Sequence, residues 1–184
     1  QDSDGLVRNF MNFDRSWMKK EPVHDALGRV LWALGTAMAS PPSLSYLPII
    51  KDCFDKSVKP VKKLYLRGLA YSILGQCYYL KQFPGASDIK RHLVMALYKL
   101  AGLYEKNRRD DWEWFEDRLT YDNAILPCAL FVGGATFGDK YLEIAKKSCE
   151  FLLETTFNGG HFSFVGCKGW YKHGETKALF DQQP

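Results

Sequence analysis

Residues 66–75 read LRGLAYSILG, and this stretch decides the fold because it belongs to a run that is apolar on nearly every side of a helix. The run covers 61–81, and Pro60 stands where such a helix would start. A helix that is apolar all round is normally buried all round. We therefore predict a buried helix over 61–81.

Two other stretches look like the same element, ALGRVLWALG at 26–35 and NAILPCALFVGG at 123–134. Helices with one apolar stripe are expected between and after them, over about 44–57, 87–107 and 140–156. Ser43 is expected to cap the first of these and Asp139 the last. Fully apolar helices thus alternate with amphipathic ones. This alternation is typical of a curved array of helical hairpins with an inner and an outer ring.

The predicted fold class is therefore all-α, an array of helical hairpins. Three hairpins would form part, about half, of a closed (α/α)6 toroid. The 184 residues suffice for one domain with a substantial core, so we expect 1–184 to be a single partial toroid. A partial ring leaves apolar edges, which self-association or a partner would cover.

Composition narrows the possible partners. Hydrophobic residues make up 46% and charged residues 25% of the chain, which is typical of soluble globular proteins. No apolar run approaches the roughly 18 residues of a membrane span, so no membrane partner is predicted. The net charge of +4 is small and dispersed, which argues against nucleic acid.

Cysteine use and motifs argue against metals and cofactors. The five cysteines are odd in number and form no CxxC pair, so neither a disulfide framework nor a metal site is predicted. A reducing, cytoplasmic setting is the simplest interpretation, and the N-terminal stretch has no signal-peptide pattern. GGATFGDK at 133–140 lacks the ending of a phosphate-binding P-loop, and we predict no cofactor.

The connection WEWFEDRLTYDNAIL at 112–126 mixes aromatic rings with carboxylates. Sugar rings dock their C–H faces on aromatic rings, while their hydroxyls need charged or amide partners. Inner helices of one array are parallel, so the connections before them meet at one rim. The predicted catalytic residues are Glu116, Asp117, Asp122 and Asp181. The predicted substrate-binding residues are Trp112, Trp114, Tyr121, Asn123, His161, Trp170, Tyr171 and Gln182.

Cleavage of a glycosidic bond requires two carboxyl groups roughly 5–10 Å apart. Glu116 and Asp117 are adjacent and point differently, so they are not expected to form the pair. The pair would combine one residue of this connection with Asp25, Glu175 or Asp181. Carboxyl groups beside large apolar rings can have the raised pKa that a general acid requires.

Each of these residues also has a structural interpretation. Asp25 and Asp122 could simply cap the helices that follow them. Pro127 would interrupt a helix that began at 122, so that helix is expected to start later or irregularly, which would leave Asp122 and Asn123 in the site. The aromatic residues could pack the connections onto the rim. His161 and His173 could act as acid–base groups or pack in a loop.

Two stretches, DDWEWFEDRLTYDNAILPCALF at 110–131 and GWYKHGETKALFDQQP at 169–184, resemble a family of helical-toroid domains. These domains occur alone or C-terminal to bacterial group 4 glycosyltransferases, often near genes for mannoside-processing enzymes. NFMNFDRSW at 9–17 and DALGRVLWALG at 25–35 are similar to the family's upstream pattern, so the resemblance covers most of the chain.

The resemblance implies an (α/α)6 toroid similar to those of glycoside hydrolases and sugar epimerases, and a carbohydrate context rather than one reaction. The chain departs from the family at His24-Asp25, where the family has a Glu-Asp pair. If that glutamate is catalytic, this chain would be impaired. The family continues past the position of Pro184 into another inner helix, so we expect an incomplete cleft.

Three functions follow from these observations. The first is a carbohydrate-active domain of a bacterial glycan-processing system, similar to a glycoside hydrolase, that acts on an oligosaccharide or glycan. The second is a non-catalytic glycan-binding or scaffold module associated with a glycosyltransferase. The third is a protein-interaction array of the helical-repeat type.

Overall fold

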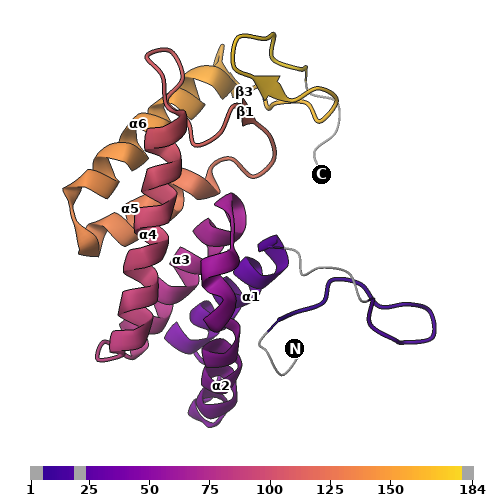
Figure 1. The fold of residues 1–184 in the computed structure, drawn as a ribbon, viewed down its shortest axis with the longest axis vertical. Helices are drawn as coiled ribbons and strands as arrows, with labels where there is room; N and C mark the ends of the chain where they lie inside the picture. Colours follow the sequence, from indigo (N-terminus) through magenta and orange to yellow (C-terminus); the bar gives the residue numbers. More distant parts are fainter. Residues whose placement is uncertain (1–5, 19–23, 180–184) are drawn as a thin grey trace. The chain divides into compact units, whose positions relative to one another are not determined.

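The structure is a computed structural model that describes residues 6–18 and 24–179. These residues are mostly helical, with α-helices α1 to α6 and four two-residue strands, as the all-α prediction requires (Figure 1). The chain divides into two compact units, Gln1–Tyr98 and Lys99–Pro184. In the described part of the chain, no helix has the length and apolar character needed to cross a bilayer.

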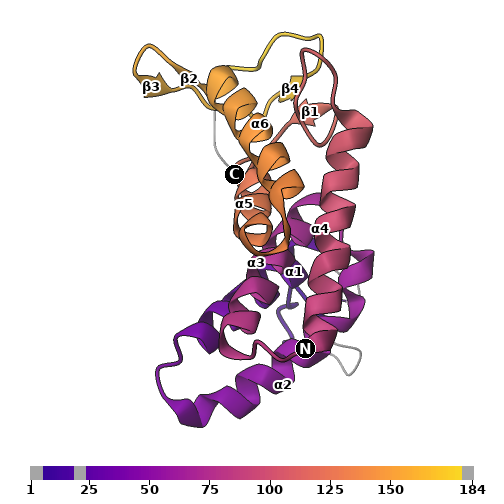
Figure 2. The ribbon, with the colours of Figure 1, turned by 90° about the vertical axis from the view of Figure 1, so that its left-hand side faces the viewer.

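Unit 1 contains the first helices of the chain. Its elements are α1 (His24–Ala39), the 3-10 helix η1 (Leu44–Tyr46), α2 (Leu47–Ser57), the 3-10 helix η2 (Lys59–Lys63), α3 (Leu66–Gln82) and the first half of α4 (Ser87–Asn107). The expected capping role of Ser43 is confirmed, because its hydroxyl accepts from the Ser45 amide at the start of η1. Helices α1 and α3 lie side by side (Figures 1 and 2).

Glycines set the close approach of α1 and α3. A Cβ built on Gly28 would lie 2.3 Å from the Gly68 carbonyl oxygen, and one built on Gly35 would lie 2.2 Å from that of Gly75. These distances are far below van der Waals contact, so the two backbones touch where the glycines meet. Glycine usually weakens a helix, but at Gly35 it allows the close packing of α1 on α3.

The predicted burial of the LRGLAYSILG helix is confirmed. All residues from Leu66 to Gln76 are buried. Its predicted start at 61 is wrong, because 59–63 form the separate helix η2 and α3 begins only at Leu66. Leu64 and Tyr65 are extended, with ψ of 148° and 147°, and this break separates the two helices.

Unit 2 is built on two neighbouring helices, α5 (Ile125–Phe137) and α6 (Asp139–Thr156) (Figure 2). Gly138 joins them. Gly138 has a φ of 124°, which residues other than glycine rarely adopt, so the chain can reverse there within one residue. The expectation that Asp139 caps α6 is wrong. Gly138 occupies the cap position and Asp139 is the first helical residue. The negative charge of Asp139 there interacts favourably with the positive end of the helix dipole.

The connections of unit 2 contain four short strands, β1 (Arg118–Leu119), β2 (Phe157–Asn158), β3 (His161–Phe162) and β4 (Tyr171–Lys172). β2 and β3 form a hairpin whose turn is Gly159-Gly160, with φ of 60° and 82°. Two consecutive residues with positive φ match the tight turn that the twist of a hairpin favours. β1 pairs with β4 in antiparallel register.

Candidate functional site

The pairing of β1 with β4 joins the two segments that the sequence analysis singled out. Leu119 lies opposite Tyr171 in this ladder, and the amide of His173 donates to the Asp117 carbonyl at 2.9 Å. The connection before α5 and the tail after α6 therefore meet within unit 2. This is the arrangement that a site shared by 112–123 and 161–173 requires.

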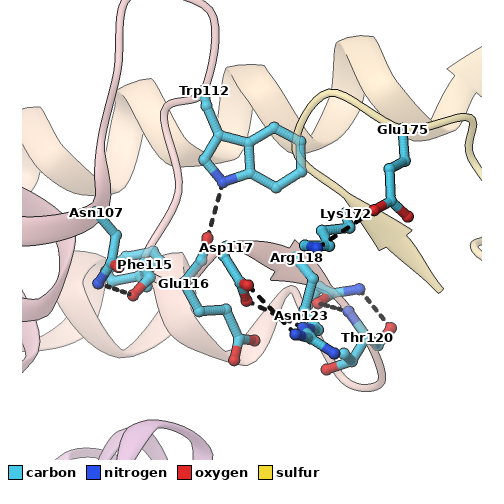
Figure 3. Close-up of polar contacts among 10 residues, drawn as sticks. All are labelled: Asn107, Trp112, Phe115, Glu116, Asp117, Arg118, Thr120, Asn123, Lys172 and Glu175. Atoms are coloured by element: carbon cyan, nitrogen blue, oxygen red, sulfur yellow. Dashed lines mark hydrogen bonds and ion pairs between the residues drawn. The ribbon is translucent and has the colours of Figure 1, made fainter.

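Trp112 and Trp114 are core residues in this structure. Their exposed fractions are 1% and 0%. The Trp112 ring contacts the rings of Phe151 and Tyr171 edge-on, with ring centroids 5.0 and 5.2 Å apart. Its indole N–H donates to the Glu116 carbonyl at 2.7 Å (Figure 3). Neither indole offers a face to a ligand. The structure thus corrects the expectation that these two rings bind sugar and favours the packing alternative.

Asp117 forms an ion pair with its neighbour. Arg118 Nε and Nη2 donate to its two carboxylate oxygens at 3.0 and 3.2 Å (Figure 3). The hydrogen bonds from Arg118 hold the pKa of Asp117 below its ordinary value. Asp117 is therefore ionised at neutral pH, and the idea of a carboxyl group with a raised pKa acting as general acid does not apply to it.

The structure also places most of the other carboxylates that were considered for catalysis. Glu116 is half-buried and its main-chain carbonyl receives the Trp112 indole N–H. Glu175 forms an ion pair with Lys172 at 3.3 Å (Figure 3). Asp25 lies in the first turn of α1, in unit 1. Asp181 and Gln182 lie outside the described residues.

Asp122 does not cap α5. The helix begins at Ile125 with Ala124 at the cap position, so Asp122 lies two residues upstream. Its φ is 44°, in the left-handed region that non-glycine residues seldom occupy, although aspartate tolerates it better than most. Pro127 is the third helical residue, where a missing N–H costs little, and this confirms the predicted late start of the helix.

Asn123 holds the bend before α5. Its side-chain oxygen accepts from the Thr120 amide at 3.1 Å, and its side-chain nitrogen donates to the Thr120 carbonyl at 2.8 Å (Figure 3). The two bonds close a small ring that fixes the chain from 120 to 123. Asn123 therefore shapes the connection that presents Asp122.

Four other predicted sugar contacts lie near this end. Tyr121, Trp170 and Tyr171 are half-buried, and Trp170 has a φ of 59°. His161 is exposed on β3, with its Nδ1 atom 3.3 Å from the Gly159 carbonyl. None of these four lines the pocket described next.

A pocket of about 540 Å³ lies between α5, α6 and the chain around β3. Such a volume lies within the range of small-molecule sites. Its walls are mainly apolar, with polar side chains contributed by the bend before α5. The lining residues are Thr120, Asp122, Asn123, Ala124, Pro127, Cys128, Phe131, Val132, Cys149, Leu152, Leu153, Thr156, Phe162, Phe164 and Val165.

The aromatic rings of the pocket are phenylalanines that the sequence analysis did not select. Phe131, Phe162 and Phe164 are 39%, 50% and 48% exposed, so part of each ring is open to solvent. The rings of Phe162 and Phe164 are stacked, with centroids 5.6 Å apart and planes within 5°. Their spacing of two residues was the available signal, because alternate side chains of an extended chain share one face.

The described lining of the pocket contains few ionisable groups. Asp122 is the one carboxylate among the described lining residues. Cys128 lies near it, and burial of the thiol, together with the charge of Asp122, raises the pKa of Cys128. The thiol is therefore protonated at neutral pH and a poor nucleophile.

Comparison with known proteins gives no family assignment. No family model matches the chain, and no significant match to a curated protein or to a solved structure was found. The resemblance to helical-toroid domains and the arrangement that it implies therefore stay predictions.

Proposed function

We propose that this chain is a non-catalytic carbohydrate-binding module of a glycan-processing system, and that the pocket between α5 and α6 is its binding site. One observation carries the proposal. The pocket combines partly exposed phenylalanine rings with one carboxylate among its described lining residues, at the place where the two segments selected from the sequence meet. The resemblance to domains that accompany glycosyltransferases supports the carbohydrate context.

The proposed contacts follow from the chemistry of sugars. The stacked rings of Phe162 and Phe164 provide an apolar surface for the C–H face of a pyranose. The Asp122 carboxylate belongs to the pocket lining, and a carboxylate accepts hydrogen bonds from hydroxyl groups. The side-chain bonds between Asn123 and the Thr120 backbone keep this part of the lining in place.

Binding is favoured over hydrolysis because the second carboxyl group is missing from the described lining. A glycosidase needs one carboxyl group as acid and another as base or nucleophile. Asp117 is outside the lining and is held ionised by Arg118. Cys128 is protonated and cannot replace a nucleophile efficiently.

The test is isothermal titration calorimetry of the whole chain with a panel of mannosides, glucosides and galactosides. Phe164→Ala should weaken binding about fivefold, because one aromatic contact contributes about 1 kcal/mol. Phe10→Ala is the control, because Phe10 is 61% exposed in unit 1 and does not line the pocket.

The same samples distinguish binding from catalysis. Asp122→Asn should reduce the affinity for the sugar. Neither the wild type nor this variant should release a free sugar. Release of a free sugar by the wild type that disappears in Asp122→Asn would favour the glycoside hydrolase instead. Failure of the whole panel to bind would reject the carbohydrate proposal.

A further inference from the structure

The pocket is polar at one end only. Thr120, Asp122 and Asn123 come from the bend before α5, whereas the lining from α5 and α6 is almost wholly apolar. Two of the polar side chains in the lining bond within the protein. The Asn123 amide group bonds to the Thr120 backbone, and the Thr156 hydroxyl donates to the Leu152 carbonyl at 2.6 Å.

This asymmetry limits what can fill the pocket. A sugar carries a hydroxyl on most of its carbons, and each hydroxyl buried without a partner costs about 1–3 kcal/mol. The walls formed by Val132, Leu152 and Leu153 offer no side-chain hydrogen-bonding group. A whole oligosaccharide in the pocket would therefore lose more hydrogen bonds to water than it could regain.

We propose that the ligand is a glycoconjugate with an apolar aglycone, an alkyl or aryl group attached to a neutral sugar. The sugar lies at Asp122 and against the phenylalanine rings, and the aglycone lies between α5 and α6. This inference rests on the proposed function for its sugar part. The apolar part rests on the pocket walls alone.

The charge in the lining selects the kind of head group. Asp122 is the charged residue of the described lining, and its carboxylate repels phosphate, sulfate and carboxylate groups. A hydroxyl donates to it readily. The pocket is therefore expected to prefer a neutral glycoside to a fatty acid or an alkyl phosphate of equal chain length.

The experiment compares two glycosides that share one sugar, such as methyl and octyl β-glucoside, at concentrations below micelle formation. Each methylene group that enters the pocket should increase affinity roughly fourfold. Octyl glucoside should therefore bind at least tenfold more tightly than methyl glucoside. Equal affinities for the two glycosides would overturn the proposal that the aglycone binds in the pocket, while the proposed sugar site would remain.

A second comparison keeps the octyl chain of the ligand and changes its head group. Octyl glucoside should bind more tightly than octanol and octyl sulfate. If octanol binds as well as octyl glucoside, the sugar contributes nothing, and the proposed function fails rather than the apolar pocket. If octyl sulfate binds best, the role given to Asp122 is wrong.

Two variants locate the aglycone. Leu153→Ser changes a wall residue that is 45% exposed, so the fold should tolerate it, and it should reduce the preference for octyl over methyl glucoside several-fold. Leu44→Ser is the control, because Leu44 is 72% exposed in unit 1 and outside the pocket. An unchanged preference in Leu153→Ser, or an equal loss in both variants, would overturn the assignment.

Discussion

His173 and Asp111 are 62 positions apart in the chain, and His173 Nε2 lies 3.0 Å from Asp111 Oδ1. The other ring nitrogen, Nδ1, lies 2.8 Å from Arg109 Nη1. A guanidinium group can only donate, so Nδ1 must accept and the ring proton is on Nε2, which donates to Asp111. The imidazole thus connects the two segments, and the structure favours packing over acid–base chemistry for His173.

This contact predicts a loss of stability in acid. The hydrogen bond from His173 lowers the pKa of Asp111 below its ordinary value in the folded protein. A lowered carboxyl pKa gives stability that is present above the unfolded pKa, near 4, and is lost as pH falls through the folded value. In Asp111→Asn the melting temperature should therefore fall less steeply below about pH 4 than in the wild type.

The measurement is the melting temperature of both proteins between neutral pH and about pH 2.5. Asp110→Asn is the matched control, because Asp110 is the exposed neighbour of Asp111 and should leave the acid limb as in the wild type. Parallel curves for Asp111→Asn and wild type would show that the contact with His173 does not contribute.

The contact of α1 with α3 predicts opposite results for two glycine substitutions. In Gly75→Ala the new Cβ would lie 2.3 Å from the Leu31 carbonyl oxygen, so the helices must separate, at a cost of about 2–3 kcal/mol. Gly102 lies in α4 with nothing within 4 Å of a built Cβ, so Gly102→Ala should stabilise by up to about 1 kcal/mol. Urea unfolding measures both, and equal changes in the free energy of unfolding would contradict the packing.

Helical periodicity predicted most of the helices. It gave the bounds of α4 and α6 closely, because each has one apolar stripe that repeats at helical spacing. It misplaced the start of α3, since the break at Leu64 and Tyr65 depends on backbone angles that apolar residues do not indicate. It also could not give the pairing of Gly28 with Gly68, which depends on how two helices cross.

The candidate site was harder to predict, because burial of a connection depends on residues far along the chain. Trp112 lies in a connection, yet Phe151 and Tyr171 cover it. Asp122 was selected from the sequence and lies in the pocket lining, but its position upstream of the cap depends on where the helix begins around Pro127. Both outcomes follow from tertiary contacts that local patterns do not contain.

Burial of the tryptophans predicts their response to a soluble quencher. Trp112 is 1% exposed and Trp17 is 52% exposed, so iodide should quench fluorescence from Trp17 and leave that from Trp112 nearly unchanged. Trp112→Phe should also destabilise the protein by about 1–3 kcal/mol, because it leaves the Glu116 carbonyl without its indole donor. Trp17→Phe should change stability by less than about 0.5 kcal/mol. Similar costs for the two variants would contradict the buried position of Trp112.

The backbone at Asp122 predicts a difference between two neutral substitutions. Its φ of 44° disfavours residues with an ordinary side chain, while asparagine occupies this region more readily. Asp122→Ala should therefore be less stable than Asp122→Asn by about 1 kcal/mol, although both remove the same charge. At Asp117, which does not have a positive φ, the alanine and asparagine variants should agree within about 0.5 kcal/mol. The free energies of unfolding of these four variants decide the point, and an equal effect of alanine and asparagine at 122 would exclude the left-handed backbone that places Asp122 in the pocket.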